Sequence, residues 1–221
     1  MKLHTLRRNT GILTAVFALS LGLAACGDDD DSGSDAKDDT NSSAPADDMG
    51  DDGADPAAQT FGDGCSQIPT SGDGSFSGMV QDPVGTAAST NPLLKTLTAA
   101  VGAVEGLGDT LNSAEGLTVF APADPAFAEI APADLNALIE GAAKDGMKSD
   151  LATVLTYHVV AGQLDPASVV GDQTSLQGGT LKVEGDENGM TVNGANVLCG
   201  NIPTANATVY VIDGVLNPSD G

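Results

Sequence analysis

Three cysteines and two histidines are the side chains of this 221-residue chain that could do distinctive chemistry. Cys26 ends the run Leu23-Ala24-Ala25-Cys26 and is followed by Gly27. The run resembles a lipobox, in which two small residues fit a signal peptidase and the thiol takes a diacylglyceryl group before cleavage. We expect Cys26 to carry lipid and to begin the mature protein. Two or three acyl chains on one residue would hold it firmly to a membrane.

The segment that would deliver Cys26 has the order of a bacterial export signal. Lys2, Arg7 and Arg8 form a basic start, and residues 11–25 follow without a charge. That apolar run is shorter than the roughly 20 residues of a comfortable transmembrane helix. We therefore expect residues 1–25 to be a lipoprotein signal peptide. The alternatives are an ordinary signal peptide that happens to contain a cysteine, or an uncleaved anchor.

Cys65 and Cys199 are the other two cysteines. An exported chain meets oxidising conditions, so a disulfide is the default for these two residues. The alternative is a pair of free thiols.

His158 is the one histidine that would remain after cleavage. A catalytic or metal-binding histidine needs partners, and the mature chain offers no second one. A G-x-S-x-G nucleophile motif is absent from the sequence, and no Gly-rich stretch is followed by the Gly-Lys-Ser/Thr of a phosphate loop. We expect His158 to lie in or near the core, with its ring holding a neighbouring group. The expectation is therefore no catalytic residue, no metal and no cofactor.

Acidic residues outnumber basic ones by 31 to 8, which gives a formal net charge of −23. Such a chain repels phosphate backbones, so we expect no nucleic-acid partner. Residues 27–60 alone hold 12 Asp and one Lys. They have too little apolar surface to offset the entropy cost of ordering, so we expect residues 26–64 to be a lipidated N-terminus and disordered tether of at least about 35 Å. Specific calcium binding there is a weaker alternative, because no EF-hand loop pattern is present.

Apolar runs with Gly and Pro punctuation follow the tether and predict an α+β fold. Helices are expected to start at four Asx-Pro pairs, in which the Asx side chain caps the helix. The pairs are Asp82-Pro83, Asn91-Pro92, Asp124-Pro125 and Asp165-Pro166. Strands are expected at residues 117–120, 180–184, 190–192, 195–198 and 208–212. Asn193-Gly194 predicts a tight hairpin between two of them.

Three stretches carry a resemblance to a known family. They are TVFAPADPAF (118–127), LTYHVV (155–160) and ATVYVIDGVLNP (207–218). In this order and spacing they resemble the signature boxes of the fasciclin, or FAS1, domain. Two further stretches, 81–101 and 197–213, are similar to the immunogenic secreted fasciclin antigens of mycobacteria and their surface lipoprotein sibling. The motif residues that we single out are Thr118, Phe120, Pro122, Asp124, Phe127, Tyr157, His158, Tyr210 and Asp213.

The resemblance implies a single FAS1 domain at residues 65–218, a wedge of about seven strands packed with several helices. It also implies the disulfide Cys65–Cys199, which closes a loop of 134 residues. In the chain-entropy model so long a loop is worth about 5 kcal/mol. From the order of the first box we expect Asp124 to cap the helix that Phe127 begins to bury.

The function implied by the resemblance is non-enzymatic. We expect a protein anchored by lipid on the extracytoplasmic face of the membrane, at the cell surface, with release as a second fate. Its FAS1 domain, expected to be monomeric, would serve adhesion or contact with an extracellular protein or glycan. The alternative is an envelope lipoprotein that binds a ligand or cation, which would need an apolar pocket with converging polar groups. An acyl-transfer or hydrolytic enzyme is the third hypothesis, and it would depend on His158.

Overall fold

The computed structural model describes residues 55–219. The expected signal peptide, the lipidated Cys26 and the tether up to residue 54 lie outside the described residues. The described residues all belong to one compact unit. Both of its hydrophobic cores are built from residues 61–216, so this part of the chain holds the packing that it needs to fold by itself.

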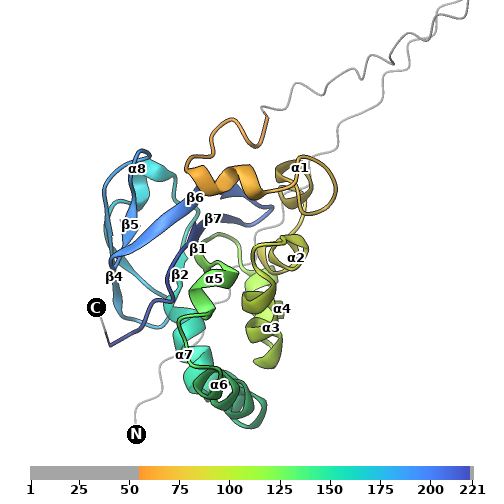
Figure 1. Cartoon of the computed structure of the whole chain (residues 1–221), viewed down its shortest axis with the longest axis vertical. Helices are drawn as coiled ribbons and strands as arrows, with labels where there is room; N and C mark the ends of the chain where they lie inside the picture. The colour runs from red at the N-terminus through yellow and green to blue at the C-terminus, as the bar shows by residue number, and fades with distance from the viewer. Residues whose placement is uncertain (1–54, 220–221) are drawn as a thin grey trace, which may run out of the picture. The chain divides into compact units, whose positions relative to one another are not determined.

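Helices predominate in this unit up to residue 157. The 3-10 helices are η1 (Asp63–Gln67) and η2 (Gly146–Lys148). The α-helices are α1 (Phe76–Met79), α2 (Val84–Thr90), α3 (Lys95–Ala103), α4 (Leu107–Ser113), α5 (Asp124–Phe127), α6 (Pro132–Asp145), α7 (Asp150–Tyr157) and α8 (Pro166–Val169). In Figure 1, α2, α3 and α4 lie together on one side of the central strands, and α6 lies beside α7.

Seven strands form one mixed sheet in the order β2-β1-β7-β6-β5-β4-β3. They are β1 (Leu117–Pro122), β2 (Val159–Ala161), β3 (Gly171–Thr174), β4 (Thr180–Glu184), β5 (Thr191–Val192), β6 (Ala195–Pro203) and β7 (Ala207–Ile212). The central pair β1 and β7 is parallel, and every other pair is antiparallel. The expected α+β class and the seven strands are confirmed.

The sheet bends into a wedge because β6 belongs to both of its halves. Residues 195–196 of β6 pair with β5, whereas residues 197–203 pair with β7 across two register shifts. Such irregularities bend a strand and increase its twist. The strands at the two ends of this order, β2 and β3, also approach each other. Val160 of β2 forms a bridge with Ser175, which follows β3, and Leu176 N–H donates to the Val159 carbonyl at 2.7 Å.

The described unit has two separate hydrophobic cores, one inside the wedge and one between the sheet and the helices. The wedge core, between the two halves of the sheet, holds Phe120, Tyr157, Val160, Val169, Leu181, Val183, Met190, Val192, Tyr210, Ile212 and Leu216. The helical core, between β1, β6, β7 and the helices, is made mainly of Leu, Val and Ala. All six residues of β1 are buried because both of its faces are covered. In contrast, β4 alternates between exposed and buried residues, with one face in the wedge core.

The strand predictions agree well with the structure. The predicted strand at 180–184 coincides with β4, and the predicted strand at 208–212 lies within β7. Asn193 and Gly194 have φ of 46° and 86°, as a type I′ hairpin turn requires. Strands β2 and β3 were not predicted. The polar sequence GDQT of β3 gave no strand signal.

The prediction of four Asx-Pro helix caps is wrong in three cases. Asp165 does cap α8, accepting from Ser168 N–H at 2.7 Å. The helix α2 begins after Asp82-Pro83 with no side-chain cap of its own, and α3 begins at Lys95 rather than at Pro92. The Asn91 carboxamide instead accepts from Leu93 N–H in the turn before α3. Asp124, the fourth case, is described with the site below.

The segment before Cys65 also has a defined place, although the sequence assigned it to the tether. Phe61 forms a two-way backbone bridge with Gly200, and its ring lies 6.3 Å from that of Tyr210. A Cβ on Gly200 would meet the Phe61 ring at 2.3 Å, so only glycine fits beneath it. Asn201 Nδ2 also donates to the Gln59 carbonyl at 3.0 Å, so residues 59–61 are held against β6.

Candidate functional site

Tyr157 and His158 end α7 and hold two different parts of the molecule. Tyr157 is fully buried, and its hydroxyl donates to the Thr180 carbonyl at 2.7 Å and accepts from Asn193 Nδ2 at 2.9 Å. It therefore fixes the start of β4 and the β5–β6 turn to the end of α7. Gly179 leaves room for the ring, because a Cβ there would lie 2.8 Å from Tyr157 Cε2.

His158 holds the C-terminal segment. Leu216 N–H donates to His158 Nε2 at 2.9 Å, so Nε2 carries no proton. The proton is therefore on Nδ1, which lies 2.8 Å from the Val154 carbonyl and donates to it. Burial lowers the pKa of His158 to about 4, although the bond to Val154 opposes that shift. The ring is neutral at pH 7 and both nitrogens are used, as expected of a core histidine rather than a general base.

The first box places its residues around β1 and α5. Thr118 Oγ1 donates to the Gly162 carbonyl at 2.7 Å and accepts from Leu164 N–H at 2.9 Å. Phe120 lies in the wedge core, with its ring 5.7 Å from that of Tyr210. Pro122 ends β1, and Phe127 is buried in the helical core.

Asp124 does not cap its own helix, so that prediction is wrong. The N-cap residue of α5 is Ala123, and no side chain caps this helix. The Asp124 carboxylate accepts from Thr96 N–H at 2.7 Å, and its own N–H donates to the Leu93 carbonyl at 2.8 Å. Asp124 thus satisfies a free N–H in the first turn of α3 and docks that helix onto the end of β1.

In the closing box, residues 207–218, Tyr210 and Asp213 form hydrogen bonds to two neighbouring segments. Tyr210 is buried and donates its hydroxyl to the Leu164 carbonyl at 2.9 Å, and burial raises its pKa well above the ordinary value. Asp213 receives two bonds from Asn196, one from the backbone N–H and one from Nδ2, both at 2.7 Å. These contacts attach the Leu164 loop and the start of β6 to β7.

A disulfide joins Cys65 in η1 to Cys199 in β6, with the two Cα atoms 4.8 Å apart. It is the pair that the resemblance implies. Cys199 is fully buried in the helical core, and Cys65 packs against that core.

Two asparagines with a central structural role were not recognised from the sequence. Asn206 accepts from Val84 N–H at 2.8 Å and donates Nδ2 to the Leu111 and Ala114 carbonyls at 2.8 and 2.9 Å. It therefore caps α2 and holds the end of α4 against β7. Its partners are 92 or more residues away in the chain, so no local pattern identifies them.

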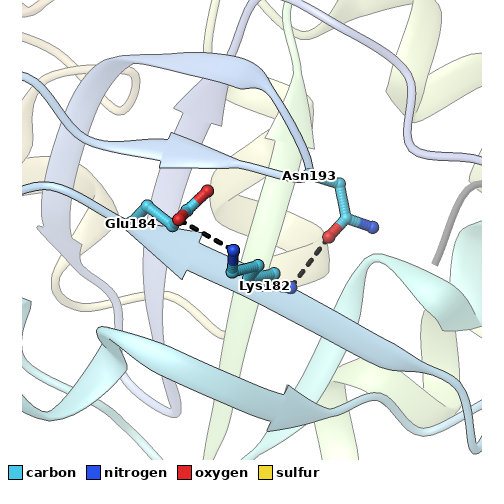
Figure 2. A network of polar contacts seen from close by, with 3 residues as sticks. All are labelled: Lys182, Glu184 and Asn193. Carbon is cyan, nitrogen blue, oxygen red and sulfur yellow. Dashed lines mark hydrogen bonds and ion pairs between the residues drawn. The ribbon is translucent and has the colours of Figure 1, made fainter.

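Asn193 is the second of these residues. Its Oδ1 accepts from Lys182 N–H at 2.8 Å, in addition to the bond from its Nδ2 to Tyr157. Figure 2 shows this contact next to the ion pair between Lys182 Nζ and Glu184 Oε1, which are 2.9 Å apart. Both charged side chains are about 60% exposed, so the ion pair adds little stability. The Asn-Gly signal predicted the turn but not these bonds.

Two of the cavities on the helical side have Leu155 and His158 in common. The α6 cavity, about 250 Å³, is lined by Pro122, Phe127, Ile130, Leu135, Leu138, Leu151, Val154, Leu155, His158, Val215, Leu216 and Asn217. The smaller α2 cavity, about 50 Å³, is lined by Val84, Gly85, Ala88, Leu97, Thr98, Val101, Leu111, Val119, Phe120, Leu155, His158 and Val159.

In residues 55–219, which the structure describes, no group of three or more His, Cys, Asp or Glu side chains could hold a metal ion. Nor does any helix of that range have the length and apolar character needed to cross a membrane. The motif residues hold the wedge, the helices and the C-terminal segment together.

Comparison with known proteins shows which family has this sequence and fold. The fasciclin domain model matches residues 92–218. The chain is 47% identical over 176 residues to the cell surface glycolipoprotein MPT83 of Mycobacterium tuberculosis, covering 75% of each chain. It is 46% identical over 170 residues to the immunogenic protein MPT70 of the same species, covering 73% of this chain and 84% of that protein.

A solved structure has the same fold. It is a FAS1 domain pair from the insect cell adhesion molecule fasciclin I, with a TM-score of 0.50 and 16% identity. The match covers 65% of this chain and 53% of that one. On the family match and the two mycobacterial relatives, this chain belongs to the fasciclin domain family, a non-enzymatic family that includes surface antigens.

Proposed function

We propose that the protein is a lipid-anchored cell-surface protein that presents its FAS1 domain for adhesion or for contact with an extracellular protein or glycan. The observation that carries the proposal is the 47% identity, over three quarters of each chain, to a protein named as a cell surface glycolipoprotein. The run Leu23-Ala24-Ala25-Cys26 supplies the corresponding anchor. The acidic residues 27–60 serve as a self-repelling spacer between the membrane and the domain.

The charge of the domain limits which classes of partner it can bind. Residues 61–221 hold 19 acidic residues and four lysines, and arginine is absent after residue 8. An RGD-type motif is therefore excluded, as is bidentate arginine recognition of a carboxylate. A basic, neutral or cation-bridged partner fits this surface best.

Adhesion is preferred to the two other functions. A polar solute or a cation would need polar groups that converge on a pocket, and the imidazole at the α6 cavity already has both nitrogens bonded. Esterase activity would need the same imidazole as a base. A His158→Ala variant that lost a measurable esterase activity of the soluble domain would reverse this preference.

Anchoring is tested in cells with the full chain. Growth with an alkyne analogue of palmitate should label the protein, and Cys26→Ser should abolish the label and release the protein from the membrane fraction. A Cys65→Ala, Cys199→Ala double variant is the matched control, because it removes the two disulfide-bonded cysteines together and should keep the label on Cys26. Unchanged labelling of Cys26→Ser would contradict the anchor.

Adhesion is tested by capture. Residues 55–221 on beads are incubated with cell-surface and matrix extracts, with calcium present or chelated. A saturable partner whose binding weakens with salt is expected, because acidic surfaces bind through screened electrostatics. A reproducible absence of any partner in both conditions would count against adhesion.

A further inference from the structure

The longest described helix, α6, does not seal its apolar side. Leu135, Leu138, Ile139 and Ala142 recur at helical spacing, yet only Ala142 is buried. The α6 cavity lies on this side, between α5, α6, α7 and the C-terminal residues 215–217. Its volume of about 250 Å³ equals that of roughly eight water molecules in the liquid.

The lining of the α6 cavity gives water few partners. It includes Phe127, Leu135, Leu138, Val154 and Val215, and none of its residues is charged. Two polar side chains belong to the lining, the imidazole of His158 and the carboxamide of Asn217. The imidazole has both nitrogens bonded, to the Val154 carbonyl and to Leu216 N–H, and Asn217 Oδ1 already accepts from Ser219. Since a water molecule in a cavity needs two to four polar partners, this space suits an apolar occupant better than ordered water.

We propose that the α6 cavity binds one free, uncharged molecule through its hydrocarbon chain. The volume lies just below the range of about 300–1,000 Å³ typical of small-molecule sites, so it fits a chain or a small ring rather than a large ligand. No lysine lines the cavity, and the domain around it carries 19 acidic residues against four lysines. A neutral head group is therefore favoured over a carboxylate or phosphate.

His158 connects the site to the C-terminal segment. The bond from Leu216 N–H to His158 holds residues 215–217 as one wall of the cavity. Leu155 and His158 also separate it from the smaller α2 cavity, which is lined by the same two residues from the other side. A longer chain would have to move one of these side chains, which limits the length of the ligand.

The test uses residues 55–221 and N-phenyl-1-naphthylamine, an uncharged fluorophore that brightens in apolar surroundings. Saturable binding of one molecule per chain is expected. Decanol should displace the fluorophore, and decanoate at pH 7 should do so several-fold less well. The variant Leu138→Trp fills the cavity from a half-exposed position and should weaken binding at least about tenfold. The control Asn136→Trp adds the same side chain at an exposed position of α6 and should bind as the unmodified domain does.

Three results would overturn the proposal. The first is an absence of saturable binding in a domain shown to be folded by circular dichroism. The second is equal binding by Leu138→Trp and Asn136→Trp, which would place the fluorophore elsewhere. The third is association only with phosphatidylcholine vesicles and not with dissolved decanol, which would mean that the domain contacts bilayers rather than single molecules. Adhesion does not depend on this site, so its failure would leave the proposed function standing.

Discussion

The wedge core and the helical core are packed in different ways. The wedge core contains both tyrosines of the chain and Phe120, each fully buried, and each tyrosine hydroxyl is hydrogen bonded. The helical core is dominated by smaller aliphatic side chains, and the two cavities of about 50 and 250 Å³ lie beside it. Large rings that are held by hydrogen bonds can move less than short helices that pack through Leu, Val and Ala side chains.

This difference suggests a division of work. From the packing we expect the wedge to act as a rigid support and the helical side to adapt to another molecule. Low local stability is typical of regions that bind and move. Tyr157 and His158 stand at the boundary, one bonded to the wedge and the other to the segment that lines the α6 cavity.

The largest expected effect comes from the cross-link on the helical side. Replacing Cys65 and Cys199 with alanine removes a constraint on a 134-residue loop and should cost up to about 5 kcal/mol of unfolding free energy. Chemical denaturation measures the loss, and reductant added to the unmodified domain should reproduce it. A change below about 1 kcal/mol would mean that the helical side does not depend on the disulfide.

The next prediction compares the loss of unfolding free energy from one substitution in each core. Leu181→Ala removes a fully buried side chain from the wedge core and should cost about 4 kcal/mol. The matched variant Leu97→Ala, beside the α2 cavity, should cost nearer to about 2–3 kcal/mol. Urea denaturation gives both values. If Leu97→Ala costs as much as Leu181→Ala, the cores are equally tightly packed.

The third prediction concerns how the stability of the domain changes with pH because of His158. Its pKa is about 4 in the folded protein and 6.5 in an unfolded chain, so the unfolded state binds the proton more readily. Stability from the neutral ring is complete above pH 6.5 and is lost as the pH falls from 6.5 through about 4, by about 3 kcal/mol. His158→Gln should flatten this part of the stability curve. An unchanged slope in that variant would assign the pH dependence to carboxylates instead.

The smallest expected effect is the loss of one hydroxyl. Tyr157→Phe keeps the ring but leaves the Thr180 carbonyl and Asn193 Nδ2 without their partner, at a cost of about 1–2 kcal/mol. Amide exchange in β4 and β5 should accelerate more than exchange in α7. A uniform acceleration would show that Tyr157 does not hold β4 and β5 in particular.

The sequence predicted the parts of the fold that depend on neighbouring residues. The strand at 180–184 and the Asn193-Gly194 turn follow from alternation and turn chemistry within a few residues. The Asp165-Pro166 pair caps its helix as expected because Ser168, its partner, is three residues away.

The errors and omissions concern partners that are distant in the chain. Asp124 accepts from Thr96 and Asn206 caps α2, across 28 and 122 residues, so only the tertiary structure brings those groups together. The sequence identified His158 as a core residue but could not reveal that it binds Leu216, which is 58 residues away. The α6 cavity was also missed, because its wall is assembled from four separate segments.

Amide hydrogen exchange on residues 55–221 tests the contrast between the two sides most directly. We predict that the amides of β1, β6 and β7 exchange only through global unfolding, whereas those of α6 and of residues 215–219 exchange through local opening at a lower free energy. Saturating decanol should slow the second group and leave the first unchanged. Equal protection of both groups, with no response to decanol, would contradict a rigid wedge that carries an adaptable helical side.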